Sequence, residues 1–442
     1  MSTEATEHPA RVSRAPLKAW AVLVLLMVAS IVSFVDRQVV AIVVEPMKVD
    51  LAISDTEVGW LYGVFPVFYA VAAWPIAYLA DSRSRKHIIA AGIFFWSVMT
   101  IACGLSRHFW QVFLARIGVG VGEASLGPAT VSMVADLFPR HQVPLALSVF
   151  QTAAVMGSGL AFIIGGVVLS LVQAAEPLTI PGFGELAPWQ QTFVYVGVPG
   201  LFLAVAFLFL REPKRSAPPP KEPRIAMLMT FYRTHARALA LHHFGFLAFA
   251  LLGYAFVFWS VSFFVRVHGL EAAYAAQVFG WIFLLTGPLG PVLAALFAGW
   301  LARRGRDDAN IVAGLVGGCL AVPFIVAIQF APTPFWAFVL YVPAMIFVNA
   351  PFGLANGSLP VIAPQAIHAQ VAAVYLFVVS IGNLLGPPIA GFFNETVFPE
   401  PEGVRYSIIS VTVAFGLVGA LLLQLARKPY GRAYAARGAV GP

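Results

Sequence analysis

Four ionisable residues lie inside long apolar stretches of this chain, and they are the side chains best placed to do chemistry. Asp36 and Arg37 are adjacent in the first apolar stretch, and Arg116 and Glu123 lie in the fourth. A charge in hydrocarbon is costly unless it is paired or hydrated, so such residues usually mark a substrate or proton pathway. The sequence therefore predicts a membrane protein with a group of functional charged residues inside its membrane-spanning part.

The depth of these residues can be read from their positions in the stretches. Asp36 and Arg116 each lie about seven residues, or roughly 10 Å, below the same surface. They are expected on different helices at similar depth, where they could pair. Glu123 follows Arg116 by two turns on one helical face and lies deeper, as an acid of the central cleft. Arg37 points away from Asp36 and is expected to act as a gate or structural partner.

A carboxylate beside an arginine stays ionised, whereas burial favours its neutral form. This competition suits a group that takes up and releases a proton as access switches sides. We therefore predict that Asp36, Arg37, Arg116 and Glu123 couple transport to protons. The alternative is that the four charges form static structural ion pairs.

The composition excludes an ordinary soluble fold. The chain has 442 residues, of which 60% are hydrophobic and 11% charged, with a net charge of +7, whereas soluble domains carry about 25% charged residues. The positive-inside rule explains the basic balance more simply than nucleic-acid binding does. Cys103 and Cys319 lie far apart in apolar runs, which predicts neither a disulfide nor a metal site. No Walker loop or nucleophile elbow occurs, so no enzyme activity is expected.

Twelve stretches are long and apolar enough to span a membrane as helices, which needs about 20 residues each. The first is expected to be a retained span and not a signal peptide, because it is long and lacks a cleavage pattern. The predicted spans are residues 19–43, 56–80, 87–106, 109–136, 143–173, 190–211, 241–267, 273–302, 310–331, 334–359, 365–394 and 404–427.

A proline-rich basic segment, residues 212–240, divides the chain into two six-helix halves. We predict bundles over 19–211 and 241–427, and cytoplasmic tails over 1–18 and 428–442. The later part of the linker, with Arg224, Arg233 and Arg237 among apolar residues, could form an amphipathic helix on the membrane surface.

The distribution of basic residues predicts the orientation. With twelve spans, the tails and even-numbered loops carry 21 Lys and Arg residues, and the opposite side carries four. This asymmetry places both termini and the linker in the cytoplasm. The chain is therefore expected to be a multi-pass protein of the plasma membrane, which in a bacterium is the inner membrane.

The second half has no charge away from its helix ends, but it carries mild polar and aromatic side chains. Such aromatics are usually packing or lipid-facing residues. The division of charge nevertheless suggests ion chemistry in the first half and recognition of an apolar body in the second, which would suit an amphiphile. The predicted substrate cavity, besides Glu123, comprises Tyr254, Trp259, Asn349, Asn356, Tyr375 and Asn383.

Charges at the ends of the early helices could latch those helices in one state. Asp81, Arg85 and Lys86 follow the second stretch, and Asp136 ends the fourth. The alternative is that these charges only lie at the membrane surface and help to orient the helices. The histidines, including His242 and His243, have no ligand spacing and are expected to be solvated or interfacial, so no metal site is predicted.

The helix-4 pattern Arg116-x-x-x-Gly120-x-Gly122 resembles the major facilitator superfamily. The loop after the second stretch resembles the same family's Gly-x-x-x-Asp-Arg-x-Gly-Arg-Arg motif. Asp81, Arg85 and Lys86 are retained in it, whereas Ala77, Ser82 and Ser84 replace the first glycine, an arginine and the second glycine. The resemblance implies an inner-gate role for Asp81, Arg85, Lys86 and Asp136, with a looser latch than usual.

Within that superfamily the chain is similar to the spinster branch. The matching stretches are Phe34-Val-Asp36-Arg37, Gly122-Glu123-Ala124-Ser125, Pro128-Ala129, Asp136-Leu-Phe138 and Gly157-Ser-Gly159. Eukaryotic spinster transporters export sphingosine 1-phosphate and lysophospholipids. The resemblance implies a bacterial homologue with proton-linked roles for Asp36, Arg116 and Glu123.

The expected fold is an all-α membrane protein with twelve transmembrane helices in two six-helix bundles. The expected function is alternating-access, proton-coupled transport of an amphipathic or lipid-like anion. The first alternative is an uncoupled facilitator for a small polar solute such as a sugar or organic acid, and the second is a membrane receptor or scaffold. The proton is the expected coupling ion, with no other cofactor. Membrane lipids are the expected surroundings, nucleic acid is not a partner, and the protein is expected to be a monomer.

Overall fold

The computed structural model describes residues 16–139, 141–213 and 225–438. The described residues of the first half form eight helices and a two-stranded antiparallel hairpin. Their bounds are α1 Leu17–Ile42, α2 Val44–Leu51, α3 Asp55–Ser82, α4 Arg85–Gly104, α5 Phe109–Glu123, α6 Leu126–Leu137, α7 Val143–Ala174, β1 Thr179–Ile180, β2 Gly184–Glu185 and α8 Pro188–Leu208.

The described residues of the second half form helices and 3₁₀ turns joined by short connections. Its elements are α9 Ile225–Thr234, α10 Ala236–His268, α11 Ala272–Thr286, α12 Leu289–Arg303, α13 Ala309–Gln329, α14 Pro334–Gly357, α15 Leu359–Ile362, the 3₁₀ turn η1 Gln365–Ile367, α16 His368–Thr396, the 3₁₀ turn η2 Pro401–Gly403 and α17 Val404–Gly438.

The prediction of an all-α fold with twelve spans is confirmed. Within the described part of the chain, twelve helical segments are long and apolar enough to cross a membrane. Three of the segments contain a break that hydrophobicity alone did not reveal. The breaks separate α5 from α6, α11 from α12, and α14 from α15.

Two expected boundaries differ from the observed ones. The predicted tail from residue 428 is helical to Gly438, because α17 continues beyond its apolar stretch and buries Tyr430, whose hydroxyl donates to the Ser358 carbonyl oxygen at 2.8 Å. The predicted linker is also partly helical, since α9 forms within it and α10 begins at Ala236. Residues 1–15 and 214–224 of the predicted tail and linker lie outside the described residues.

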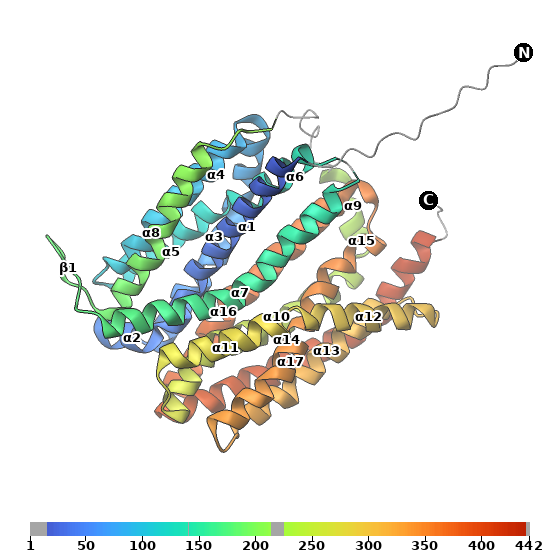
Figure 1. The fold of residues 1–442 in the computed structure, drawn as a ribbon. Helices are drawn as coiled ribbons and strands as arrows, with labels where there is room; N and C mark the ends of the chain where they lie inside the picture. The colour runs from blue at the N-terminus through green and yellow to red at the C-terminus, as the bar shows by residue number, and fades with distance from the viewer. Residues whose placement is uncertain (1–15, 140, 214–224, 439–442) are drawn as a thin grey trace, which may run out of the picture.

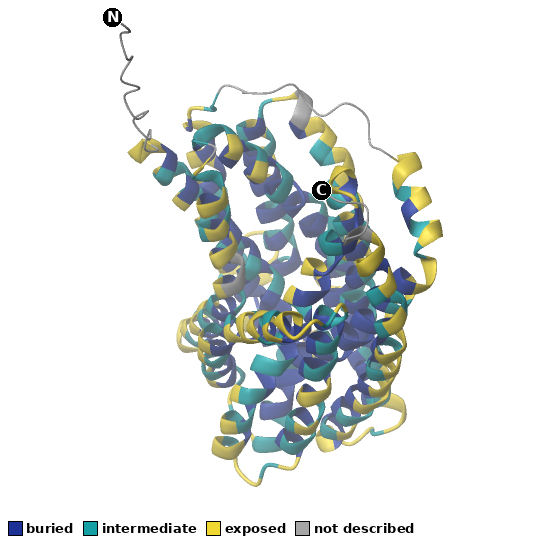
Figure 2. Cartoon of the chain, turned by 90° about the vertical axis from the view of Figure 1, so that its right-hand side faces the viewer, coloured by how far each residue is buried: buried dark blue, intermediate teal, exposed yellow. Residues whose placement is uncertain are grey.

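The helices form two bundles, α1–α8 and α10–α17, which lie side by side (Figure 1). We call the end that carries α2 and the β1–β2 hairpin the hairpin end, and the end where α8 stops and α10 begins the linker end. The bundles approach each other near α2 and α11 and diverge toward α6, α9 and α15. Buried residues fill the interior, and exposed residues cover the outward helix faces (Figure 2).

The two halves pack most closely where α3 meets α16 and α7 meets α11. At Gly59 of α3, an added Cβ would lie 2.6 Å from the Cα atom of Pro388 in α16. Main-chain atoms cannot move aside as a flexible side chain can, so only glycine permits this approach. The contact lies in the hairpin-end half of both helices, which means that the halves are closed together at that end.

We predict that Gly59→Leu forces the halves apart at the hairpin end, because the new side chain would overlap the backbone at Pro388. The measurement uses a variant free of native cysteines with spin labels at the exposed residues Val49 and Val397, one in each half. The distance between the two labels should be longer in Gly59→Leu than in the unsubstituted protein. Gly357→Leu is the matched control, since a Cβ at Gly357 meets nothing within 4 Å. An unchanged distance in Gly59→Leu would contradict the prediction.

Candidate functional site: a cavity between the two halves

A cavity of about 620 Å³ lies between the two bundles. Along α3 its lining extends from Tyr62 to Ala77, and along α16 from Asn383 back to Ala373. Both sets of residues continue from the closed hairpin-end contact toward the linker end. The cavity therefore occupies the space where the halves diverge, as Figure 1 shows for their helices.

The first-half wall of the cavity contains an ion pair between α1 and α5. The Arg37 Nε atom donates to Glu123 Oε2 at 2.7 Å, and the Ser33 hydroxyl donates to the same oxygen at 2.5 Å. The Glu123 side chain is fully buried, whereas Arg37 lines the cavity. The pair thus presents its cation to the cavity and keeps its anion behind it.

Aromatic rings surround the Arg37 guanidinium on the cavity side. Its central carbon lies 4.9, 4.8 and 5.1 Å from the ring centres of Phe34, Phe65 and Tyr69. Cations are attracted to such ring faces, and the rings also limit access of water. The arginine is therefore held in place by contacts that an incoming anion need not break.

Arg116 and Asp36 do not form the expected side-chain pair. Arg116 Nη1 donates to the main-chain oxygen of Asp36 at 2.9 Å, and its Nε donates to the Leu61 oxygen at 3.2 Å. The buried Nη2 atom of Arg116 has no hydrogen-bond partner among the described residues. The two residues therefore lie at the same level of the bundle, but Arg116 contacts the backbone of α1 and not the Asp36 carboxyl group.

The Asp36 carboxyl group is fully buried on another side of α1. The Trp96 indole and the Thr100 hydroxyl of α4 are its polar neighbours, and no described cation forms an ion pair with it. The side chains of Asp36 and Arg37 diverge because consecutive helical residues point about 100° apart. Asp36 is therefore a buried acid that faces two neutral donors and forms no ion pair among the described residues, and it is adjacent in sequence to the arginine that faces the cavity.

Three of the predicted cavity residues line the cavity, namely Tyr254, Asn349 and Asn383. Polar lining residues that the predicted set left out include Gln38 and Ser380. Ser380 is one of the mild polar side chains of the second half and Gln38 is adjacent to Arg37, so both could have been added from sequence position alone.

The other predicted cavity residues lie elsewhere. Trp259 is buried, with its indole donating to the Pro387 oxygen at 3.0 Å. Tyr375 is buried against two histidine rings, and Asn356 is exposed near the linker end of α14. Glu123 stands behind Arg37 and does not line the cavity. Helical spacing could not separate these positions from lining positions, because one sequence does not show which face of a helix meets the cavity.

At the linker end, the Arg85 guanidinium is buried within a network of first-half residues. Its Nη1 atom lies 2.5 Å from Asp136 Oδ2, and its Nε atom lies 3.2 Å from Glu212 Oε1. Ser84 also donates to Glu212, and Lys86 donates to the Leu208 oxygen at 3.0 Å. Two of the predicted gate residues, Arg85 and Asp136, are thus brought together.

This network differs from the expected gate in its composition. Glu212, which ends the first half just after α8, is a member that the sequence reasoning missed. The Asp81 side chain lies outside the described residues. The contacts of Arg85 join α4 to α6 and to the chain after α8, all within the first half. The network therefore stiffens one bundle, and none of these contacts crosses to the other.

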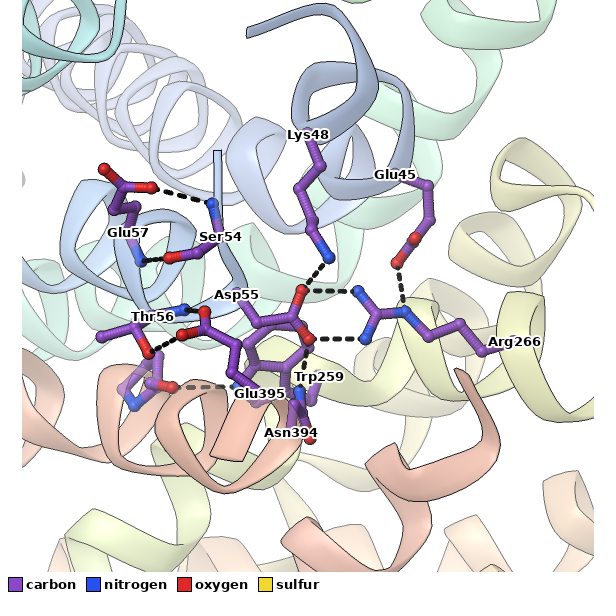
Figure 3. A network of polar contacts seen from close by, with 11 residues as sticks. Glu45, Lys48, Ser54, Asp55, Thr56, Glu57, Trp259, Arg266, Asn394 and Glu395 are labelled. Atoms are coloured by element: carbon purple, nitrogen blue, oxygen red, sulfur yellow. Dashed lines mark hydrogen bonds and ion pairs between the residues drawn. The ribbon is translucent and has the colours of Figure 1, made fainter. Parts of the chain in front are cut away.

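A second polar network crosses between the halves at the hairpin end (Figure 3). The Asp55 carboxylate of α3 accepts two hydrogen bonds from Arg266 of α10, at 2.6 and 2.9 Å. It accepts a third from the Asn394 side-chain amide of α16 at 2.7 Å. Lys48 also pairs with Asp55, and Glu45 accepts from Arg266 at 2.9 Å. We call these residues the hairpin-end clamp.

Another contact between the halves lies beside the clamp. Glu395 of α16 accepts hydrogen bonds from the main-chain nitrogen of Thr56 at 2.5 Å and from its hydroxyl at 3.0 Å. Bidentate and charge-assisted contacts of this kind are the stronger class of hydrogen bond. The clamp and this contact together hold the halves shut at the end opposite the cavity.

The described residues contain no group of three or more His, Cys, Asp or Glu side chains arranged to hold a metal ion. The lining of the cavity supplies two arginines from the first half, amide and hydroxyl groups from both halves, and apolar surface.

Comparisons with known proteins agree with this geometry. A model of the Major Facilitator Superfamily matches residues 26–387. An MFS-type efflux pump of Mycolicibacterium smegmatis is 26% identical over 97% of this chain and 96% of that protein. Protein spinster homolog 1 of Rattus norvegicus is 30% identical, over 67% of this chain and 58% of that protein.

The fold is also similar to that of a solved structure. A bacterial homolog to the human lysosomal transporter spinster, crystallised in an inward-facing and occupied conformation, aligns with a TM-score of 0.81 at 25% identity. The alignment covers 94% of this chain and 98% of that one. The resemblance that the sequence motifs predicted is thus confirmed.

We predict that Glu123→Leu lowers the free energy of unfolding by about 3–5 kcal/mol, because it leaves the Arg37 charge without its partner. The double variant Arg37→Leu/Glu123→Leu should recover most of this loss. Chemical unfolding in detergent would measure both. Glu402→Leu is the control, since its pair with Arg405 is exposed and such pairs contribute about 0–1 kcal/mol. A double variant as unstable as the single one would refute the pairing argument.

A pH-dependent stability is expected from the linker-end network. Burial tends to raise the pKa of Glu212, but hydrogen bonds from Ser84 and Arg85 and the charge of Arg85 outweigh it and hold the pKa below its ordinary value of 4.5. The stabilisation is therefore present above that value and is lost as the pH falls through the folded-state pKa. The thermal midpoint should fall less on acidification in Glu212→Gln than in the wild type. The same substitution at exposed Glu176 should leave the wild-type profile unchanged.

Proposed function

The chain belongs to the major facilitator superfamily, and on that premise we propose that it is a proton-coupled transporter that moves an amphipathic or lipid-like anion by alternating access. The observation that carries the proposal is the arrangement of Asp36, Arg37 and Glu123 beside the cavity. A cation lies at the cavity wall, one acid is paired with it, and a second buried acid forms no ion pair among the described residues.

The cavity chemistry favours a substrate with an anionic group and an apolar body. Arg37 and Arg116 both line it, and one Nη atom of Arg116 has no partner among the described residues. Aromatic and aliphatic side chains, including Phe283, Phe352 and Leu376, form much of the remaining wall. A headgroup would bind near the arginines, and an acyl or other apolar chain would lie toward the linker end.

Charge balance then provides the coupling. An anionic headgroup that binds Arg37 competes with Glu123 for the same guanidinium. Two anions on one cation in a low-dielectric site repel each other, and a proton on either buried acid relieves that repulsion. Asp36 is the acid at which a proton can be added without breaking an ion pair, so we assign it as the protonation site and Glu123 as the group that exchanges partners.

The basic residues near the linker end orient the molecule with that end in the cytoplasm. The structure then corresponds to an inward-facing state, closed on the far side by the hairpin-end clamp and open toward the cytoplasm. Movement to the opposite state requires the clamp to separate and the linker-end parts of α3 and α16 to close over the cavity.

One observation favours a second function. The Arg37–Glu123 pair is already complete at 2.7 Å, as a static structural pair would be. The cavity also offers Gln38, Asn349 and Asn383, whose amides suit a hydroxylated solute. An uncoupled facilitator for a sugar or organic acid would fit these two features.

Transport into liposomes separates the two functions. We expect uptake of a labelled lysolipid to respond to an imposed pH gradient, and Asp36→Asn to abolish that response while its thermal midpoint stays near the wild-type value. Asp50→Asn is the matched control, since Asp50 accepts from the Trp189 indole at 2.8 Å, far from the cavity lining. A wild type that is indifferent to pH, or one for which sugars compete better than lysolipids, would reject proton-coupled lipid transport.

A further inference from the structure

Two adjacent histidines, His242 and His243 of α10, are buried near the linker end, contrary to the expectation of solvated histidines. Their exposed fractions are 0% and 5%. The two Nδ1 atoms lie 3.0 Å apart, His242 Nε2 lies 2.7 Å from the Ser358 hydroxyl, and His243 Nε2 lies 2.9 Å from the Tyr232 hydroxyl. We call Tyr232, His243, His242 and Ser358 the histidine chain.

The partners determine where the protons of this chain lie. Ser358 donates its hydroxyl to the Ala355 oxygen at 2.9 Å, so it accepts from His242 Nε2. In a neutral imidazole only one nitrogen donates. His242 therefore accepts at Nδ1 from His243 Nδ1, and His243 accepts at Nε2 from Tyr232. Burial raises the pKa of Tyr232 to about 12, which keeps its hydroxyl protonated as a donor.

The histidine chain connects the interdomain linker to a break in a spanning helix. Tyr232 belongs to α9, the short helix that follows the linker, and Ser358 separates α14 from α15. Tyr430 of α17 donates to the Ser358 oxygen at 2.8 Å, and the Tyr375 ring of α16 packs on both histidines. Every residue of the histidine chain is buried or half-buried. When α9 moves, these residues must therefore move with it or lose their contacts.

The helix α9 has an apolar surface that no described residue covers. Phe231 is its buried residue and anchors it to the second half. Ile225, Met227 and Met229 are 53%, 42% and 49% exposed. Figure 2 shows this helix, which follows the grey linker trace, as largely exposed.

The basic residues near this surface indicate what covers it. Arg233 at the end of α9 and Arg237 at the start of α10 are exposed. Exposed apolar residues beside arginines are typical of a helix that lies at the boundary between lipid headgroups and acyl chains. In a chain that spans the bilayer twelve times, the nearest apolar phase is the bilayer itself, and the arginines match anionic headgroups.

We propose that α9 is a lipid-sensing helix that docks on anionic headgroups of the bilayer and transmits its docked position through the histidine chain to the break between α14 and α15. Anionic lipid thereby sets how readily the linker-end part of the second half moves. This regulation does not depend on which substrate the cavity carries.

Hydrogen–deuterium exchange of the full-length protein in vesicles tests the proposal without a transport assay. The vesicles are phosphatidylcholine alone or an equimolar mixture with phosphatidylglycerol. We expect the anionic lipid to slow exchange several-fold both in residues 225–234 and in residues 355–363. Equal exchange in the two kinds of vesicle would overturn the proposal.

Two sets of variants locate the effect. Arg233→Gln/Arg237→Gln should abolish the response to anionic lipid in both segments. The control Arg303→Gln/Arg432→Gln removes the same charge from exposed residues near the same end and should respond as the wild type does. A control that loses the response equally would show that bulk charge, and not α9, is responsible.

His243→Phe and the milder Tyr232→Phe interrupt the histidine chain while keeping an aromatic ring at each position. Both should retain slower exchange in residues 225–234 but lose the response in residues 355–363. If either folded variant still transmits the full response to residues 355–363, the histidine chain is not the route. Tyr232→Phe removes only one hydroxyl, so it remains informative if His243→Phe does not fold.

Discussion

The ion pair between Arg37 and Glu123 is the interaction on which the rest of the site depends. A fully buried carboxylate is stable in an apolar bundle only with a cation and further donors at hand, and Arg37 and Ser33 of α1 supply them. This requirement fixes the rotation of α1 against α5. That rotation in turn directs the Asp36 side chain away from the cavity and brings its main-chain oxygen to Arg116.

Much of the fold was accessible from the sequence because the bilayer imposes a minimum apolar length on every span. The helix breaks were less accessible. The break at Ser358 is followed by Pro360, which cannot donate a helical hydrogen bond, but the contacts that surround the break, with His242 and Tyr430, come from helices more than 70 residues away in either direction and are not visible in the sequence. The same reason explains why α17 extends beyond its apolar stretch, since the burial of Tyr430 is a tertiary contact and leaves no trace in hydropathy.

The charged residues beside the cavity were predictable, but neither their pairing nor most of the cavity lining was. Depth along a helix can be counted from the sequence, and it correctly placed Arg116 beside Asp36. Rotation about the helix axis cannot be counted, because one sequence does not show which face meets which neighbour. The pairing of Glu123 with Arg37, and the membership of Glu212 in the network around Arg85, both depend on that missing information.

The contact between Glu395 and Thr56 has a consequence for the energy of opening. The first amides of α3 have no acceptor inside the helix. Ser54 and Glu57 satisfy each other's main-chain nitrogens, but the Thr56 nitrogen is satisfied by a carboxylate from the other half of the molecule. Separation of the halves therefore uncaps α3 and removes a negative charge from the positive pole of its dipole. Part of the resistance to opening is thus a property of the peptide backbone, and every side chain at position 56 except proline would preserve it.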